Sequence, residues 1–164
     1  MKYAITSGKL TVKARSSVHD TTTVWAKVTG EVEADPEAID AATAAFRVDM
    51  TSFDAGDWLK NRKLRKDFAM DAHPTATFQL QRVSSLVPDG TMFKARAEGV
   101  LRWRGKEVVL VLAGQGTLDR ERVTATASFE LDIKRLGLVA PKFFVFKMAD
   151  EVMVEVSVHG EVVT

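Results

Sequence analysis

The sequence predicts an all-β fold in which eight antiparallel strands close into a barrel beside one helix. Apolar and polar residues alternate with a period of two in eight separate segments, a pattern typical of strands with one buried face. The short gaps between the later segments favour antiparallel neighbours. A sheet of this size with one apolar face must stack on a second sheet or close on itself, and closure also removes exposed edges.

The first half of the chain contains four of the strand segments, at residues 10–14, 24–32, 46–50 and 76–80. The alanine-rich stretch 36–45 predicts one helical turn before the third strand. Residues 57–69 lack β-branched side chains and predict a helix between the third and fourth strands, with Asp57 as its N-cap. His73-Pro74 ends this helical segment and leads into the fourth strand.

The second half shows the alternation more clearly, at residues 93–101, 123–131 and 152–158. The stretch 108–113 is instead continuously apolar, which indicates a strand that is covered on both faces. Turn-forming residues separate these segments at 88–90, 104–105 and 119–121. Together the segments predict a meander that completes the barrel.

Length and composition exclude several classes of protein. With 164 residues, of which 46 % are apolar and 27 % charged, the chain predicts a single globular domain spanning residues 1–164. Its 23 basic residues against 22 acidic ones argue against a nucleic-acid binder that relies on bulk charge. Because the chain has no cysteine, disulfides, thiolate nucleophiles and zinc–thiolate sites are excluded.

Apolar runs long enough to cross a membrane are missing from the sequence, since none reaches about 18 residues. The first residues also lack the apolar core of a secretory signal. We therefore expect a soluble, cytoplasmic protein, while a periplasmic location would fit if a signal had been removed.

Many residues on the predicted inward face are small, which indicates a hollow barrel with room for an apolar chain or ring. The alternative is a filled barrel, in which small and large residues fit the taper of a packed core. The candidate residues of the apolar cavity are Val12, Ala14, Val24, Ala26, Val28, Phe46, Val48, Ala76, Phe78, Phe93, Ala95, Ala97, Leu101, Ala125, Ala127, Phe129, Val154 and Val156.

Several short stretches, taken in order, have a familiar spacing. They are residues 12–19 (VKARSSVH), 48–54 (VDMTSFD), 64–68 (LRKDF), 73–78 (HPTATF), 99–108 (GVLRWRGKEV), 135–138 (RLGL) and 148–152 (MADEV). This order of stretches resembles the YceI-like family of lipocalin-like, polyisoprenoid-binding proteins. The resemblance implies an eight-stranded antiparallel barrel with a helix beside it and an apolar tunnel for a long isoprenoid chain. It also implies a carrier or storage role without chemistry, and dimers are common in such families.

Residues capable of chemistry are too scattered to predict a catalytic or metal site. Ser16 and Ser17 precede His19-Asp20, but adjacent residues rarely point at one another as a catalytic triad requires. His73 and His159 lie at spacings that match no metal-binding signature. We therefore expect no catalysis, no metal and no cofactor.

Positive charge is concentrated in the predicted helix, at Lys60, Arg62, Lys63, Arg65 and Lys66. One interpretation is a cationic collar that attracts an anionic head group or an acidic membrane surface, with Arg62, Arg65 and Lys66 as candidate head-group contacts. The alternative is an ordinary solvated helix face.

Two aromatic segments complete the set of candidates. Trp103 continues an inward face and is interpreted as a plug at one barrel end. The apolar connection 138–146 is interpreted as a lid or as a dimer surface near Phe143–Phe146. If the barrel is filled, that surface gives the alternative function, a structural protein acting through a homodimer or another partner.

Overall fold

In the computed structural model, which describes residues 1–18, 20–143 and 146–164, eight long antiparallel strands close into a barrel. Closure arises because β12 pairs with β1 along nearly its whole length. Around the barrel the order is β1-β3-β4-β6-β7-β8-β9-β12. The elements are β1 (Lys2–Ala14), β2 (Thr21–Trp25), β3 (Val28–Asp35), β4 (Ala38–Asp49), η1 (Met50–Ser52), β5 (Phe53–Asp54), α1 (Trp58–Asp67), β6 (Thr75–Asp89), β7 (Met92–Trp103), β8 (Lys106–Leu118), β9 (Arg122–Asp132), η2 (Ile133–Leu136), β10 (Lys142–Phe143), β11 (Phe146–Lys147) and β12 (Glu151–Val162).

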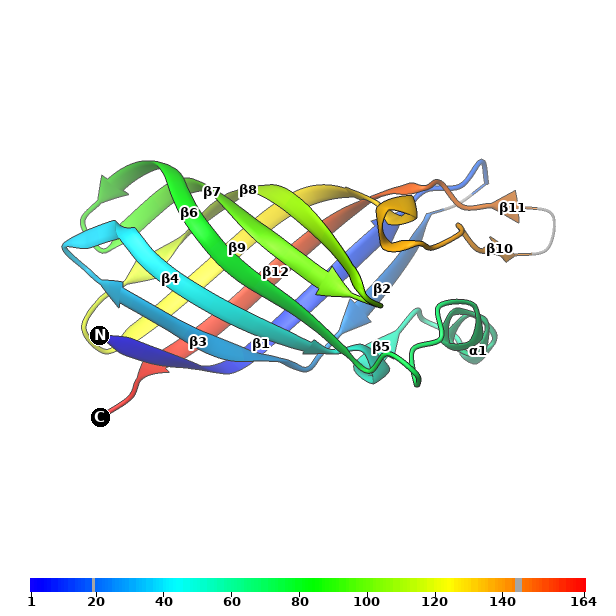
Figure 1. Cartoon of the computed structure of the whole chain (residues 1–164), viewed down its shortest axis with the longest axis horizontal. Helices are drawn as coiled ribbons and strands as arrows, with labels where there is room; N and C mark the ends of the chain where they lie inside the picture. Colours follow the sequence, from blue (N-terminus) through cyan, green and yellow to red (C-terminus); the bar gives the residue numbers. More distant parts are fainter. Residues whose placement is uncertain (19, 144–145) are drawn as a thin grey trace.

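The two ends of the barrel differ in construction (Figure 1). Both termini and the short turns after β3, β6 and β8 lie at one end. Helix α1, the 3-10 helices and the small β10–β11 pair lie at the other, which we name the α1 end. The predicted barrel is confirmed, and no helix in the described ranges is long and apolar enough to cross a membrane.

The predicted second segment, 24–32, consists of two strands, β2 and β3. Ala26 and Lys27 separate them, so the alternation does not continue across the break. Trp25 and Val28 are both buried although they are three positions apart, whereas Ala26 is exposed. Strands β2 and β3 both pair with β1, β2 near the α1 end and β3 near the opposite end. The break between them therefore does not interrupt the barrel wall.

The helical turn predicted for residues 36–45 is wrong. Strand β4 begins at Ala38 and runs between β3 and β6, with Ala44 facing Val32 on one side and Leu80 on the other. The helix propensity of alanine is a weak local preference, and pairing on both sides of the strand overrides it. A tight turn precedes β4, in which the Asp35 carboxylate accepts a hydrogen bond from the Glu37 amide.

The predicted helix and its N-cap are confirmed. Asp57 accepts a hydrogen bond of 2.8 Å from the Lys60 amide, and α1 lies between the third and fourth long strands of the barrel, β4 and β6. Only Leu64 of this helix is buried, so α1 rests at the barrel end with little of its surface covered. The connection to β6 anchors it further, because Met70 is fully buried.

Candidate functional site

An apolar cavity of about 230 Å³ lies inside the half of the barrel next to α1. Thr77 is the one polar residue among the described residues that line it. A second hollow lies on the outer surface and is lined mainly by the outward side chains of β6 to β9, which include Lys94, Arg96 and Gln115. Because apolar side chains enclose the inner cavity, whereas charged and polar side chains line the second hollow, the inner cavity is the candidate binding site.

Most of the predicted cavity residues lie in the wall of this cavity. They come from seven of the long strands, whose inward positions alternate as the sequence pattern indicates. These residues are Val12, Val28, Phe46, Val48, Ala76, Phe78, Leu101, Ala125, Ala127, Phe129, Val154 and Val156.

Six predicted residues lie outside the cavity wall, for two reasons. Val24 and Ala26 were expected to face inward, but the inward positions of β2 are Thr21, Thr23 and Trp25, so that prediction is wrong. The other four residues lie on strands of the barrel wall but at positions along the barrel axis that the cavity does not reach. They are Ala14, Phe93, Ala95 and Ala97. The structure packs Ala14 against the core at the α1 end, packs Phe93 against the cluster at the opposite end, and leaves Ala95 and Ala97 half-buried on β7.

The cavity prediction left out several residues that close the cavity at the α1 end, because Met50, Phe68, Leu136 and Leu138 lie outside the alternating segments or at their edges. Their signal was present in the stretches that carry the family resemblance, where Met50, Phe68, Trp103, Leu136 and Leu138 all occur. Trp103 was predicted on an inward face as a plug at one barrel end, and it is buried in the cavity wall at the α1 end. The lining residues absent from the cavity prediction are Leu10, Trp25, Met50, Phe68, Thr77, Leu112, Leu131, Ile133, Leu136, Leu138, Val152 and Val158.

Two buried tryptophans brace the α1 end of the cavity, and both indole N–H groups are satisfied by backbone. Trp103 donates to the carbonyl of His73 at 2.8 Å, and Trp25 donates to the carbonyl of Met50 at 3.2 Å. Each indole therefore turns its apolar surface toward the cavity without leaving a buried donor unpaired. The Arg104 guanidinium lies over the Trp103 ring and donates to the carbonyl of Phe68, which ties α1 to the β7–β8 hairpin.

A capped turn at residues 49–52 holds Met50 in the cavity wall. The Asp49 carboxylate accepts hydrogen bonds from the Thr51 hydroxyl at 2.6 Å and from the Thr51 amide at 2.9 Å. These bonds favour the charged form, so the Thr51 hydroxyl first, and then its amide, lowers the pKa of Asp49. The Met50 carbonyl in this turn also accepts the hydrogen bond from the Trp25 indole. The Asp49 carboxylate therefore helps to position two lining side chains, those of Met50 and Trp25.

Replacing Asp49 with alanine is expected to lower the free energy of unfolding by about 1 kcal/mol near neutral pH, as loss of a capping side chain does. Because the pKa of Asp49 is lower in the folded state, its contribution is present above the ordinary aspartate value of 3.8 and is lost as the pH falls below it. Urea unfolding at several pH values tests this, with the exposed Asp40→Ala as control. An Asp49→Ala deficit that persists unchanged in acid would contradict it.

Helix η2 and the residues after it cover a gap in the barrel wall. Strands β8 and β9 form their pairs between Ala113–Leu118 and Val123–Ser128, in the part of the barrel away from α1. Near the α1 end, η2 contacts β8 instead. Asp132 caps η2 at the Lys134 amide, and Gly137 ends it in the left-handed conformation, with φ of 74°. This geometry turns Leu136 and Leu138 into the cavity, so apolar packing closes the wall where strand pairing stops.

Two glycines allow close packing around a pair of phenylalanine rings in the cavity wall. Phe46 and Phe78 are cross-strand neighbours whose ring centroids are 6.3 Å apart. A Cβ atom at Gly99 would overlap the Phe78 ring, and one at Gly30 would collide with the Ala45 carbonyl oxygen and the backbone of Phe46. The missing side chain on β7 therefore leaves room for the Phe78 ring, and the one on β3 allows the backbone of β4 to approach closely.

The opposite half of the barrel is filled. Tyr3, Ile39, Leu118 and Val123 form a buried cluster there, and Tyr3 donates a hydrogen bond of 2.5 Å to the carbonyl of Asp119. None of the described members of this cluster lines the cavity. The site is therefore a blind cavity in one half of the barrel, whereas the family resemblance implied a tunnel.

The candidate head-group residues do not line the cavity. Arg65 pairs with Asp71 at 2.7 Å and lies over the Phe53 ring, while Arg62 and Lys66 are exposed on α1. Within the described residues, no group of three His, Cys, Asp or Glu side chains is arranged to hold a metal. His19, and the side chains of the predicted surface near Phe143–Phe146, lie outside the described part of the chain.

Comparisons with known proteins agree with this architecture. A family model described as the YceI-like domain matches residues 3–160. A search of the curated proteins found no match. Among solved structures, a polyisoprenoid binding domain from Saccharophagus degradans is similar over 98 % of both chains, with a TM-score of 0.79 and 15 % identity. BcnA from Burkholderia cenocepacia covers 93 % of this chain, and this chain covers 95 % of BcnA, with a TM-score of 0.73 and 20 % identity. The YceI protein of Campylobacter jejuni is similar over 87 % of this chain and 85 % of its own, with a TM-score of 0.71 and 12 % identity.

Proposed function

Because this chain belongs to the YceI-like family, we propose that its barrel binds the apolar chain of an isoprenoid lipid, for carriage or storage. The observation that carries the proposal is the cavity itself, which is enclosed by aliphatic and aromatic side chains with Thr77 as the one polar exception among its described residues. A guest in such a site gains affinity from burial of apolar surface, and hydrogen bonds contribute little. The similar domain from Saccharophagus degradans, named as polyisoprenoid-binding, supports the choice of lipid class.

The size of the cavity favours partial insertion of a long chain. Its volume of about 230 Å³ is below the range of about 300–1,000 Å³ that encloses most drug-sized ligands. The filled cluster around Tyr3 stops the cavity within the barrel. We therefore propose that one end of the isoprenoid chain enters from the α1 end and the remainder, with any head group, stays outside.

The proposed function is binding without chemistry. The described residues that line the cavity include no acid, no histidine and no lysine or arginine, and both indole N–H groups are already bonded to carbonyls. The cavity wall can therefore retain an apolar chain, but it offers no group suited to activate one.

Solvent extraction of the natively purified protein, followed by mass spectrometry of the extract, tests the proposal. We expect a prenyl quinone or prenyl phosphate at a stoichiometric ratio to protein, present at once or after incubation with such lipids. A clean extract after incubation, together with no uptake of an apolar fluorescent probe, would overturn the proposal.

A further inference from the structure

We propose that the α1 end of the barrel docks on an anionic lipid bilayer, with α1 lying at the membrane surface and the α1 end of the cavity facing it. The docking surface is defined by Trp58, Leu59, Arg62 and Lys66. This inference rests on the proposed lipid-binding function and adds the surface from which the lipid would be exchanged.

Helix α1 exposes two of its large apolar side chains, Trp58 and Leu59. Trp58 is 68 % exposed and Leu59 is 57 % exposed, although both lie in the first turn of a helix at the barrel end. At 3.6 residues per turn, the four docking residues fall within an arc of about 100°, and Leu64, which is buried, lies on the opposite side. The outward face of α1 thus combines an indole and a leucine with two long basic side chains, as helices that lie in a membrane interface do.

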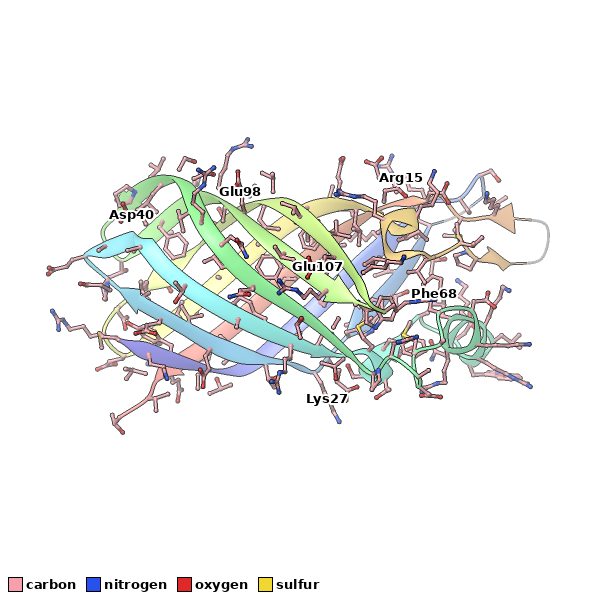
Figure 2. All side chains as sticks on the ribbon, in the orientation of Figure 1. Arg15, Lys27, Asp40, Phe68, Glu98 and Glu107 are labelled. Carbon is pink, nitrogen blue, oxygen red and sulfur yellow. The ribbon has the colours of Figure 1, made fainter. Side chains whose placement is uncertain are left out.

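The basic side chains on this face are available to a partner. Helix α1 carries five basic residues and one acidic residue. Lys63 pairs with Asp67 at 2.9 Å and Arg65 pairs with Asp71, whereas Arg62 and Lys66 form no ion pair within the described residues. Figure 2 shows nitrogen-tipped side chains that project from α1 away from the barrel.

Charge is distributed unevenly between the two ends of the barrel, although the net charge is only +1. At the opposite end, the β3–β4 turn and its flanks carry Asp35, Glu37 and Asp40, and the β6–β7 turn begins at Asp89. The exposed Arg15 adds positive charge near the α1 end (Figure 2). A negatively charged surface would therefore attract the α1 end and repel the other, which orients the barrel before contact.

The docking surface lies beside the cavity. Phe68 directly follows α1 and lines the cavity, and Figure 2 places it between the helix and the barrel. In the segment that covers the gap between β8 and β9, Leu138 lines the cavity while Val139 is 78 % exposed. Adjacent residues of this segment thus face the cavity and the outer surface. A bilayer at the α1 end would therefore lie close to a chain bound in the cavity.

Co-sedimentation with phosphatidylcholine vesicles, prepared with and without phosphatidylglycerol, tests the docking surface on the full chain. We expect binding only to the anionic vesicles, weakened by added salt. Binding should also shift tryptophan emission to shorter wavelength, and the shift reports Trp58 because Trp25 and Trp103 are only 5 % and 6 % exposed.

Two double variants separate charge from apolar insertion. Arg62→Gln with Lys66→Gln should lower the partition coefficient about thirtyfold, since each basic residue near an anionic surface contributes about fivefold. Trp58→Ser with Leu59→Ser should weaken binding and abolish the emission shift. Lys94→Gln with Arg96→Gln is the matched control, because it removes the same charge from exposed positions on β7 and should bind like the original protein. Circular dichroism confirms that each variant is folded.

The outcomes distinguish this inference from the proposed function. A protein that retains lipid but ignores anionic vesicles overturns the docking surface and leaves lipid binding intact. Vesicle binding that depends on Arg62 and Lys66 supports the docking surface, even if no lipid can be extracted from the cavity. Equal loss of binding in the Lys94 and Arg96 control, or self-association through Trp58 and Leu59 without vesicle binding, also overturns the docking surface.

Discussion

Replacing Ala127 with phenylalanine is expected to empty the barrel of lipid while leaving it folded. Ala127 lies on β9 in the wall of the cavity, beside Gly114 of β8 and Val156 of β12. A ring at this position occupies the space that a chain would fill. Exclusion of about three methylene groups lowers affinity about fiftyfold, since burial of each contributes about 0.8 kcal/mol. Mass spectrometry of extracts and titration with an apolar probe measure the loss.

The neighbouring Thr126→Phe is the matched control for this variant. Thr126 lies on the same strand but is exposed on the outside of the barrel, so its replacement adds the same ring without narrowing the cavity. We expect its lipid content to equal that of the original protein. If Ala127→Phe kept its full lipid load, the lipid would have to bind somewhere other than the cavity.

Replacing Trp103 with alanine is expected to lower the free energy of unfolding by about 3–5 kcal/mol, as for other large aromatic residues removed from a core. Trp103 is 6 % exposed, lines the cavity and donates a hydrogen bond to His73. The effect should lie at the upper end of this range, because the adjacent cavity gives the remaining side chains nothing to collapse onto. Urea unfolding followed by circular dichroism measures it.

Two further substitutions divide this loss into its causes. Trp103→Phe keeps an aromatic ring but leaves the His73 carbonyl without its donor, so we expect a smaller loss of about 1–3 kcal/mol. Trp58→Ala removes the same side chain from a site that is 68 % exposed, and its effect should stay within about 0.5 kcal/mol. Similar losses at Trp58 and Trp103 would mean that Trp103 does not brace the cavity wall.

The strands and the helix were predictable because their signals are local. Alternation along β7, β9 and β12 depends only on which side of its own strand each residue occupies. It can therefore be recognised in the sequence without knowing which strands pair. The cap at Asp57 and the helix that follows it are equally local. Local signals failed at residues 36–45, where pairing with β3 and β6 overrides alanine's helix propensity. They failed again at Ala26 and Lys27, where a break between β2 and β3 moves Trp25 inward.

The sequence by itself therefore determined the barrel, the helix beside it, the family and most of the apolar wall. Only the tertiary structure decided which half of the barrel is hollow. Tyr3 of β1 meets Leu118 and Val123, which are cross-strand partners on β8 and β9, and this cluster fills one half. In the other half, Gly99 leaves room for the Phe78 ring. The volume left inside a barrel depends on how side chains from all strands meet at each level, and no single strand's pattern contains that information.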